Sequence, residues 1–261
     1  MKLSNSLYLL VWLLLFSTTG HSQADRASIE KLMRVSGVVA QIENFSALIK
    51  KQLLQTGELF TGEKLDERSS SLAQVFETEL ILATIAEGLA KALTDDEIVE
   101  LIRWYTSKPG LLVVEADEQA FTKKAHQEMK TMATALMSDV GRMEVAKRVV
   151  KAGNLKERMA AFQKSISLVM LKALERSNDF AVPMDPAFFE GIIDAQMAAM
   201  DAKIERQALV YALYSYRQLD IETLNEYETA LRTPAMSKFK LLGTQQLGLA
   251  IENRMDQLIE P

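Results

Sequence analysis

Residues that interrupt a regular backbone are scarce in this chain. Only 11 of the 261 residues are glycine and 5 are proline, about half of their roughly 12% share in average proteins. Sandwiches and barrels need a turn about every 8–12 residues. The sequence therefore argues against both architectures and favours long, uninterrupted elements.

Those elements are predicted to be helices, because apolar residues recur at spacings of three and four almost throughout the chain after residue 25. The pattern stops over residues 56–62 and then resumes. We expect long helices over residues 109–140, 186–213 and 234–258, with the first and third contributing to a shared core. The predicted fold class is all-α, a helical bundle.

Three local signals set helix boundaries. Thr94, followed three residues later by Glu97, predicts a capping box that opens a short helix. Residues 107–110, Ser-Lys-Pro-Gly, predict a break and the start of a new helix. Asn154 and Glu157 predict a second capping box.

Composition excludes several classes of function. Hydrophobic residues at 48% and charged residues at 25% are typical of a folded globule. The net charge of −5 makes nucleic acid an unfavourable partner, since phosphate binding needs a clustered basic surface. The absence of cysteine excludes disulfides, thiol catalysis and zinc–thiolate sites. No cofactor is expected.

The first 24 residues have the layout of a secretory signal peptide. Lys2 precedes the apolar run LYLLVWLLLF at residues 7–16, and Ser22-Gln23-Ala24 offers a cleavage site before Asp25. An uncut anchor is the alternative, but ten apolar residues span only about 15 Å of a roughly 30 Å hydrocarbon core. We expect an exported, periplasmic protein with no membrane span after cleavage.

The order of breaks and caps occurs twice along the chain. Gly37 is matched by Gly153, and residues 93–107 are matched by residues 219–233 at an offset of 126. The predicted organisation is therefore a signal peptide (1–24), a first helical copy (25–141) and a second helical copy (142–261). Coincidence between two amphipathic stretches is the alternative.

Two segments resemble a bacterial envelope family known as domain of unknown function 2059 (DUF2059). Residues 32–37 read LMRVSG and are followed by QIE at 41–43, and residues 93–110 read LTDDEIVELIRWYTSKPG. The second copy departs from this pattern, with Ala230, Leu231 and Ala235 in place of Trp104, Tyr105 and Gly110. The resemblance implies an exported, all-helical bacterial protein and implies no reaction.

Catalytic motifs are missing from the sequence. After cleavage His126 is the sole histidine, and no nucleophile elbow, phosphate loop or HExxH motif occurs. The acidic runs at 95–97 and 115–118 are interpreted as charges that complement helix N-termini. We predict that the protein is not an enzyme; a muramidase-like helical enzyme that uses a single carboxylate is the alternative.

A copper site is a further alternative. His126, Met129 and Met132 follow one another at spacing three, and soft thioether and imidazole ligands suit Cu(I). Methionine also fills helical cores, and Met129 and Met132 lie on the apolar stripe. The core interpretation is favoured.

The break after the first capped helix is the best candidate for recognition. Trp104, Tyr105, Ser107 and Gly110 lie there, and an amphipathic aromatic at a helix end can present one edge to a partner. Packing of both aromatics against neighbouring helices is the alternative. The predicted function is a binding or envelope-maintenance module that contacts an unknown protein or envelope component through an exposed Trp104 and Tyr105.

Overall fold

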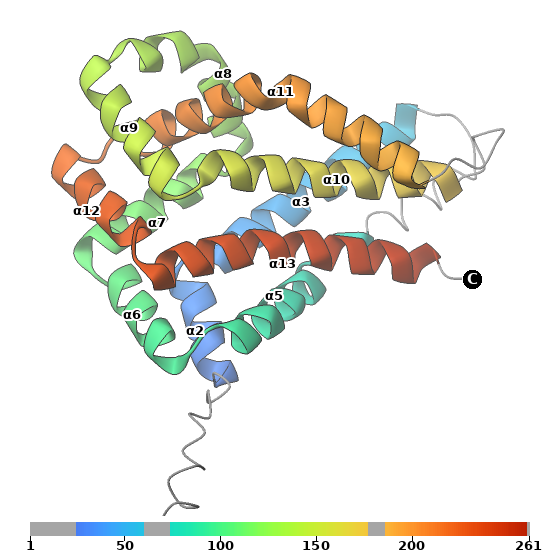
Figure 1. Cartoon of the computed structure of the whole chain (residues 1–261), viewed down its shortest axis with the longest axis horizontal. Coiled ribbons are helices and arrows are strands. Elements are labelled where there is room, and N and C mark those ends of the chain that lie inside the picture. The colour runs from blue at the N-terminus through green and yellow to red at the C-terminus, as the bar shows by residue number, and fades with distance from the viewer. Residues whose placement is uncertain (1–24, 60–73, 177–185, 260–261) are drawn as a thin grey trace, which may run out of the picture.

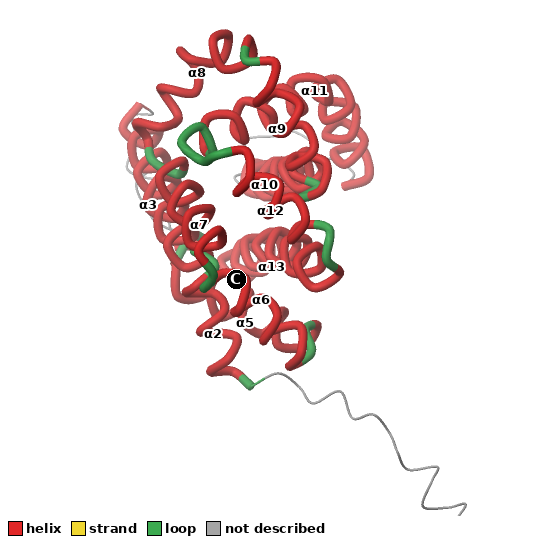
Figure 2. Tube along the Cα trace, turned by 90° about the vertical axis from the view of Figure 1, so that its left-hand side faces the viewer, coloured by secondary structure: helices red, strands yellow, loops and turns green. Residues whose placement is uncertain are grey.

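The computed structural model describes residues 25–59, 74–176 and 186–259, and within these ranges every regular element is a helix (Figure 2). The predicted all-α fold is confirmed. The helices are α2 (Arg26–Val35), α3 (Val38–Leu59), α5 (Thr78–Ala92), α6 (Asp95–Tyr105), α7 (Lys108–Ala120), α8 (Lys123–Ser138), α9 (Val140–Ala152), α10 (Leu155–Arg176), α11 (Pro186–Ser215), α12 (Ile221–Leu231) and α13 (Pro234–Ile259). The predicted signal peptide lies outside the described residues.

The long helix α10 lies between α11 and α13, and α5 lies along α13, whereas α6, α7, α9 and α12 gather at the left-hand end of the view (Figure 1). The helix α10 packs against both α11 and α13, and α13 also packs against α5. One core cluster takes side chains from both halves of the chain, including Leu32, Ile85, Tyr105, Val149 and Phe239. A smaller cluster beneath α8 contains Ala120, Ala125, Met129, Val210 and Tyr214.

Several predicted boundaries are correct. The Thr94 capping box is present: the Glu97 amide donates to the Thr94 hydroxyl and the Thr94 amide donates to the Glu97 carboxylate. The predicted helix at 234–258 corresponds to α13, and the one at 186–213 corresponds to α11. These boundaries were predictable because a cap or a proline fixes the first turn locally.

Two predicted boundaries and one predicted capping box are wrong. The single helix predicted over 109–140 is two helices, because Thr122 caps α8 by accepting a hydrogen bond from the Ala125 amide. The break predicted from residue 56 starts later, since α3 continues to Leu59. Asn154 makes no capping box in the described part of the chain and instead takes a positive φ of 47° in the turn before α10.

The two halves of the chain share local geometry. The helices α3 and α10 each have 22 residues, and α6 and α12 each have 11. The caps Thr94 and Asp220 lie 126 positions apart, as do the caps Ser107 and Thr233. Internal duplication stays a prediction that these matches support. The helix α9 starts at Val140, two residues before the predicted boundary at 142.

The closing helices cross between the halves. The helix α7 packs against α11 and α12, and α13 packs against α5 and α6. The ends of α6 and α12 are thereby brought to one place on the molecule, and the candidate site lies there.

Candidate functional site

The turn between α6 and α7 is tightly hydrogen-bonded. The Ser107 hydroxyl donates to the Trp104 carbonyl at 2.6 Å and accepts from the Gly110 amide at 3.3 Å. A Cβ atom on Gly110 would lie 2.1 Å from the Trp104 carbonyl oxygen, so that a side chain at position 110 would have to displace this carbonyl. Ser107 and Gly110, predicted as recognition residues, thus hold the turn in shape.

Trp104 and Tyr105 have different environments. Tyr105 is only 1% exposed, its hydroxyl donates to Met236 Sδ at 3.2 Å, and its ring packs edge-on against Phe239. The prediction that both aromatics are exposed is therefore wrong for Tyr105, which belongs to the core. Trp104 is half-buried and stacks on Tyr227, with ring centroids 5.5 Å apart.

Trp104 lines a groove between two helix junctions, the one that joins α6 to α7 and the one that joins α12 to α13. The groove has a volume of about 320 Å³ and is lined by Glu100, Leu101, Arg103, Trp104, Ser107, Ala230, Thr233 and Met236. This volume lies at the low end of the roughly 300–1,000 Å³ range of small-ligand sites. We call this surface the junction groove.

A small residue in the second half leaves the groove open. Ala230 stands 126 positions after Trp104, at the same place in α12 that Trp104 occupies in α6. The cap register also pairs Gly110 with Met236 rather than with Ala235, because both are the third residue of their helix. Because the Ala230 methyl group is small, the groove stays open, and the Met236 side chain forms part of its lining.

Two charged side chains line the groove beside its apolar surface. Glu100 and Arg103 are exposed and form no hydrogen bond or ion pair within the described ranges. One turn earlier, Glu97 is paired: Lys238 Nζ lies 3.0 and 2.8 Å from its two carboxylate oxygens. Burial acts to raise the pKa of Glu97, but the hydrogen bonds from Lys238 and the Thr94 amide hold that pKa below its ordinary value.

A buried polar cluster lies behind the aromatic side chains. The Asp117 carboxylate is 7% exposed and accepts hydrogen bonds from the hydroxyls of Tyr216 at 2.7 Å and Tyr211 at 3.3 Å. Burial, reinforced by the Asp117 charge, raises the pKa of both tyrosines well above 10. Tyr227, which stacks on Trp104, also packs edge-on against Tyr216.

Asp117 corrects the interpretation of the acidic run 115–118. That run lies in the second half of α7, not at a helix N-terminus, because the helix begins at Lys108 and ends at Ala120. The run 95–97 does occupy the first turn of α6, as predicted. Asp117 also has the spacing of a core position, four residues after Val113 and three before Ala120, which is the signal that could have identified it.

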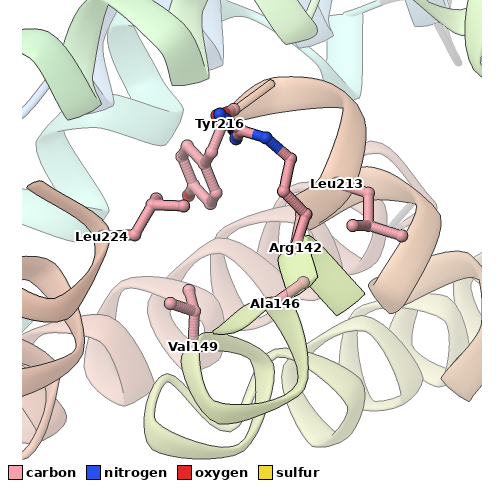
Figure 3. A pocket seen from close by; sticks show the side chains of 7 residues that line it. Arg142, Ala146, Val149, Leu213, Tyr216 and Leu224 are labelled. Carbon is pink, nitrogen blue, oxygen red and sulfur yellow. Dashed lines mark hydrogen bonds between the residues drawn. The ribbon is translucent and has the colours of Figure 1, made fainter. Parts of the chain in front are cut away.

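A second cavity lies beside Tyr216 and has a structural role. It measures about 10 Å³ and is lined by Arg142, Ala146, Val149, Ala212, Leu213, Tyr216 and Leu224, which is space for about one water molecule. Arg142 extends toward Tyr216 (Figure 3) and donates to the carbonyls of Tyr216 at 3.1 Å and Leu219 at 2.7 Å. These bonds satisfy two carbonyls of the turn between α11 and α12.

The candidate copper ligands lie on different faces of α8. His126 is exposed, Met129 is buried in the smaller cluster and Met132 is 38% exposed. Within the part of the chain that the structure describes, no three histidine, aspartate or glutamate side chains are grouped as metal ligands. None of the helices there is long and apolar enough to cross a membrane.

Comparison with known proteins gives no relative: no family model, curated protein or solved structure matches the chain. The resemblance to domain of unknown function 2059 therefore stays a prediction. The candidate site rests on the geometry of the chain itself.

Proposed function

We propose that the protein is an exported, non-enzymatic binding module whose recognition site is the junction groove. The observation that carries this proposal is the open space of about 320 Å³ beside Trp104, at the break identified in the sequence. Loops held by a rigid helical scaffold are where such contacts are usually made. Export is supported by the signal-peptide layout of residues 1–24.

The groove suits an apolar side chain presented by another protein. Leu101, Trp104, Ala230 and Met236 give it an apolar lining, and a tryptophan beside a methionine is a common composition for a surface that buries an anchor residue. The hydroxyls of Ser107 and Thr233 cap α7 and α13. Affinity would therefore come mainly from buried apolar surface.

The unpaired charges of Glu100 and Arg103 indicate which residues of the partner lie on either side of its apolar side chain. Glu100 and Arg103 are separated by three positions on α6 and so lie on one face of that helix. A segment with a basic residue on one side of its apolar anchor and an acidic residue on the other would pair with both. Such pairs at a groove edge select the partner and its orientation more than they add affinity.

A peptide selection tests this function. Purified residues 25–261, immobilised and challenged with a random peptide library, should enrich peptides that carry one large apolar residue flanked by opposite charges. Replacing Ala230 by leucine fills the groove and should abolish their binding. The matched control is Ala199→Leu, the same substitution at an exposed alanine of α11, which should leave binding unchanged. Enriched peptides that bind the A230L protein as tightly as the natural one would contradict the proposal.

A further inference from the structure

A row of aromatic side chains leads inward from the junction groove. The Trp104 ring stacks on Tyr227 with ring centroids 5.5 Å apart, and Tyr227 packs edge-on against Tyr216, also at 5.5 Å. The Tyr216 hydroxyl donates to the Asp117 carboxylate at 2.7 Å. We call Trp104, Tyr227 and Tyr216 the aromatic row. It joins an indole at the groove to a buried carboxylate through rings that are in contact.

The outer end of the aromatic row is accessible from solution. Trp104 is half-buried, whereas Tyr227 is only 4% exposed and Tyr216 only 5%. In a chain without cysteine, tryptophan and tyrosine are the side chains that lose one electron most readily. A one-electron oxidant in solution therefore reaches the row at Trp104.

The inner end of the row has a proton acceptor. A phenol that loses an electron becomes a strong acid, and its positive charge is costly in a buried place unless the proton leaves. Burial raises the pKa of Tyr216 and Tyr227, so that both hydroxyls carry their protons at pH 7. The Asp117 carboxylate lies within direct proton-transfer distance of the Tyr216 hydroxyl. Tyr216 can therefore lose an electron and its proton together.

Tyr105 also contacts the indole but lacks such an acceptor. Its ring centroid lies 5.0 Å from that of Trp104. Its hydroxyl donates to the Met236 thioether, which is a weak acceptor and does not take up the proton. The ammonium of Lys240, half-buried on α13, lies 5.7 Å from the Tyr105 ring centroid and opposes the loss of an electron there. Burial lowers the pKa of Lys240 to about 8, so the ammonium form predominates at pH 7. Proximity alone would select Tyr105, whereas the proton acceptor selects Tyr216.

We propose that the aromatic row carries an oxidising equivalent from Trp104 to Tyr216. A small inorganic radical takes one electron from the Trp104 indole and leaves a radical cation. One electron then passes from Tyr216 through the Tyr227 ring to Trp104, while the Tyr216 hydroxyl proton moves to Asp117.

The products of this transfer are an intact indole, a neutral phenoxyl radical and a carboxylic acid. The positive charge of the indole and the negative charge of the carboxylate thus cancel. If the indole proton has first passed to water, it returns from water with the electron. The transfer restores the tryptophan of the junction groove, and it does not depend on what the groove binds.

Pulse radiolysis of residues 25–261 in azide solution tests this transfer. The azide radicals oxidise Trp104, the sole tryptophan of this range, and the indolyl and phenoxyl radicals are followed by their separate absorption bands. The indolyl band should decay as the phenoxyl band grows, at a rate that is independent of protein concentration. Tyr216→Phe should abolish this coupled change. Asp117→Asn keeps the shape of the acceptor but removes the base, and should slow the transfer at least about 100-fold, as loss of a positioned proton acceptor does.

Tyr105→Phe is the matched control, because it removes the hydroxyl of the tyrosine that touches the indole directly. This variant should transfer at the natural rate. Circular dichroism must show the natural helical spectrum for each variant compared. An unchanged rate in the Tyr216→Phe protein, a Tyr105→Phe protein that transfers as slowly as the Asp117→Asn protein, or a rate proportional to protein concentration would overturn the proposal.

Discussion

Neighbouring residues at the end of α6 contribute to different parts of the molecule. Successive side chains on a helix point about 100° apart, so that Tyr105 enters the core while Trp104 lies at the groove. The sequence identified the pair but not this division. Both residues match an apolar period, and only the packing of α12 and α13 against α6 decides which one is covered.

The division predicts unequal costs of mutation. Tyr105→Ala should lower the free energy of unfolding by about 3–5 kcal/mol, because it empties a fully buried site. Trp104→Ala removes a half-buried ring and one stacking contact and should cost about 1–2 kcal/mol. Urea unfolding followed by circular dichroism measures both. Replacing both aromatic residues by alanine therefore destabilises the protein. A binding test at this pair must alter Trp104 and keep Tyr105.

Tyr105→Phe is the matched control, since it removes only the hydroxyl that donates to Met236. This variant should lower the free energy of unfolding by about 0.5–1.5 kcal/mol. A Tyr105→Ala protein as stable as the Phe variant would show that Tyr105 is not a core residue.

Lys240 predicts a pH dependence of stability with a defined sign. Its pKa is about 8 in the folded protein and about 10.4 in an unfolded chain. Between these values the unfolded chain binds more protons, so that stability rises with pH from about 8 to 10. Below pH 8 Lys240 is protonated in both the folded and the unfolded state. The folded protein then bears the full cost of the buried ammonium, which lowers the free energy of unfolding by at most about 3 kcal/mol.

Lys240→Met should therefore stabilise the protein at pH 7 and flatten the rise between pH 8 and 10, as measured by urea unfolding at each pH. Above pH 10 both proteins should lose stability, because burial raises the pKa of Tyr105, Tyr211 and Tyr216 in the folded state. A variant that is less stable at pH 7, with the rise unchanged, would contradict this assignment.

Helix starts were predictable from sequence where one residue decides them. Thr94 caps α6 and Pro234 starts α13 without help from distant residues. The break at Thr122 was missed because Val114, Phe121 and Ala125 continue an apolar spacing across it. The spacing alone does not show that the Thr122 hydroxyl binds the Ala125 amide.

The α6–α7 turn predicts opposite outcomes for two glycine-to-alanine changes. Gly110→Ala should cost about 1–3 kcal/mol, because the new methyl group meets the Trp104 backbone carbonyl and must displace it. Gly243→Ala in α13 meets nothing within 4 Å and should stabilise by about 0.5–1 kcal/mol through helix propensity. Thermal unfolding of the two variants compares them directly. Equal effects would mean that the turn is not as tight as the structure has it.

At the scale of the whole molecule, the junction groove depends on residues far apart in sequence. Trp104 and Ala230 line one groove because α7 and α13 each pack against the other half of the chain. The sequence could locate the break at Trp104 but not the surface that faces it. Lys240 was missed for the same reason, since its surroundings come from other helices, whereas the core spacing of Asp117 could have been recognised in the sequence.

This crossing predicts that the two halves unfold together. Trp104 is the sole tryptophan of residues 25–261, and its fluorescence reports on the junction, whereas far-ultraviolet circular dichroism reports on all helices. In urea the two signals should change with one midpoint. A fluorescence transition separated from the circular dichroism transition would show that the halves are independent.

The central claim is that the junction groove holds an apolar side chain of another protein, and site-specific photo-cross-linking in intact cells tests it most directly. A photoreactive residue in place of Arg103 should cross-link to one protein, through a segment that carries an apolar residue between opposite charges. A second substitution, Ala230→Leu, should abolish that cross-link, whereas Ala199→Leu should not. The same cross-links in the Ala230→Leu protein, or equal cross-linking from the exposed position Gln245 on α13, would contradict the account.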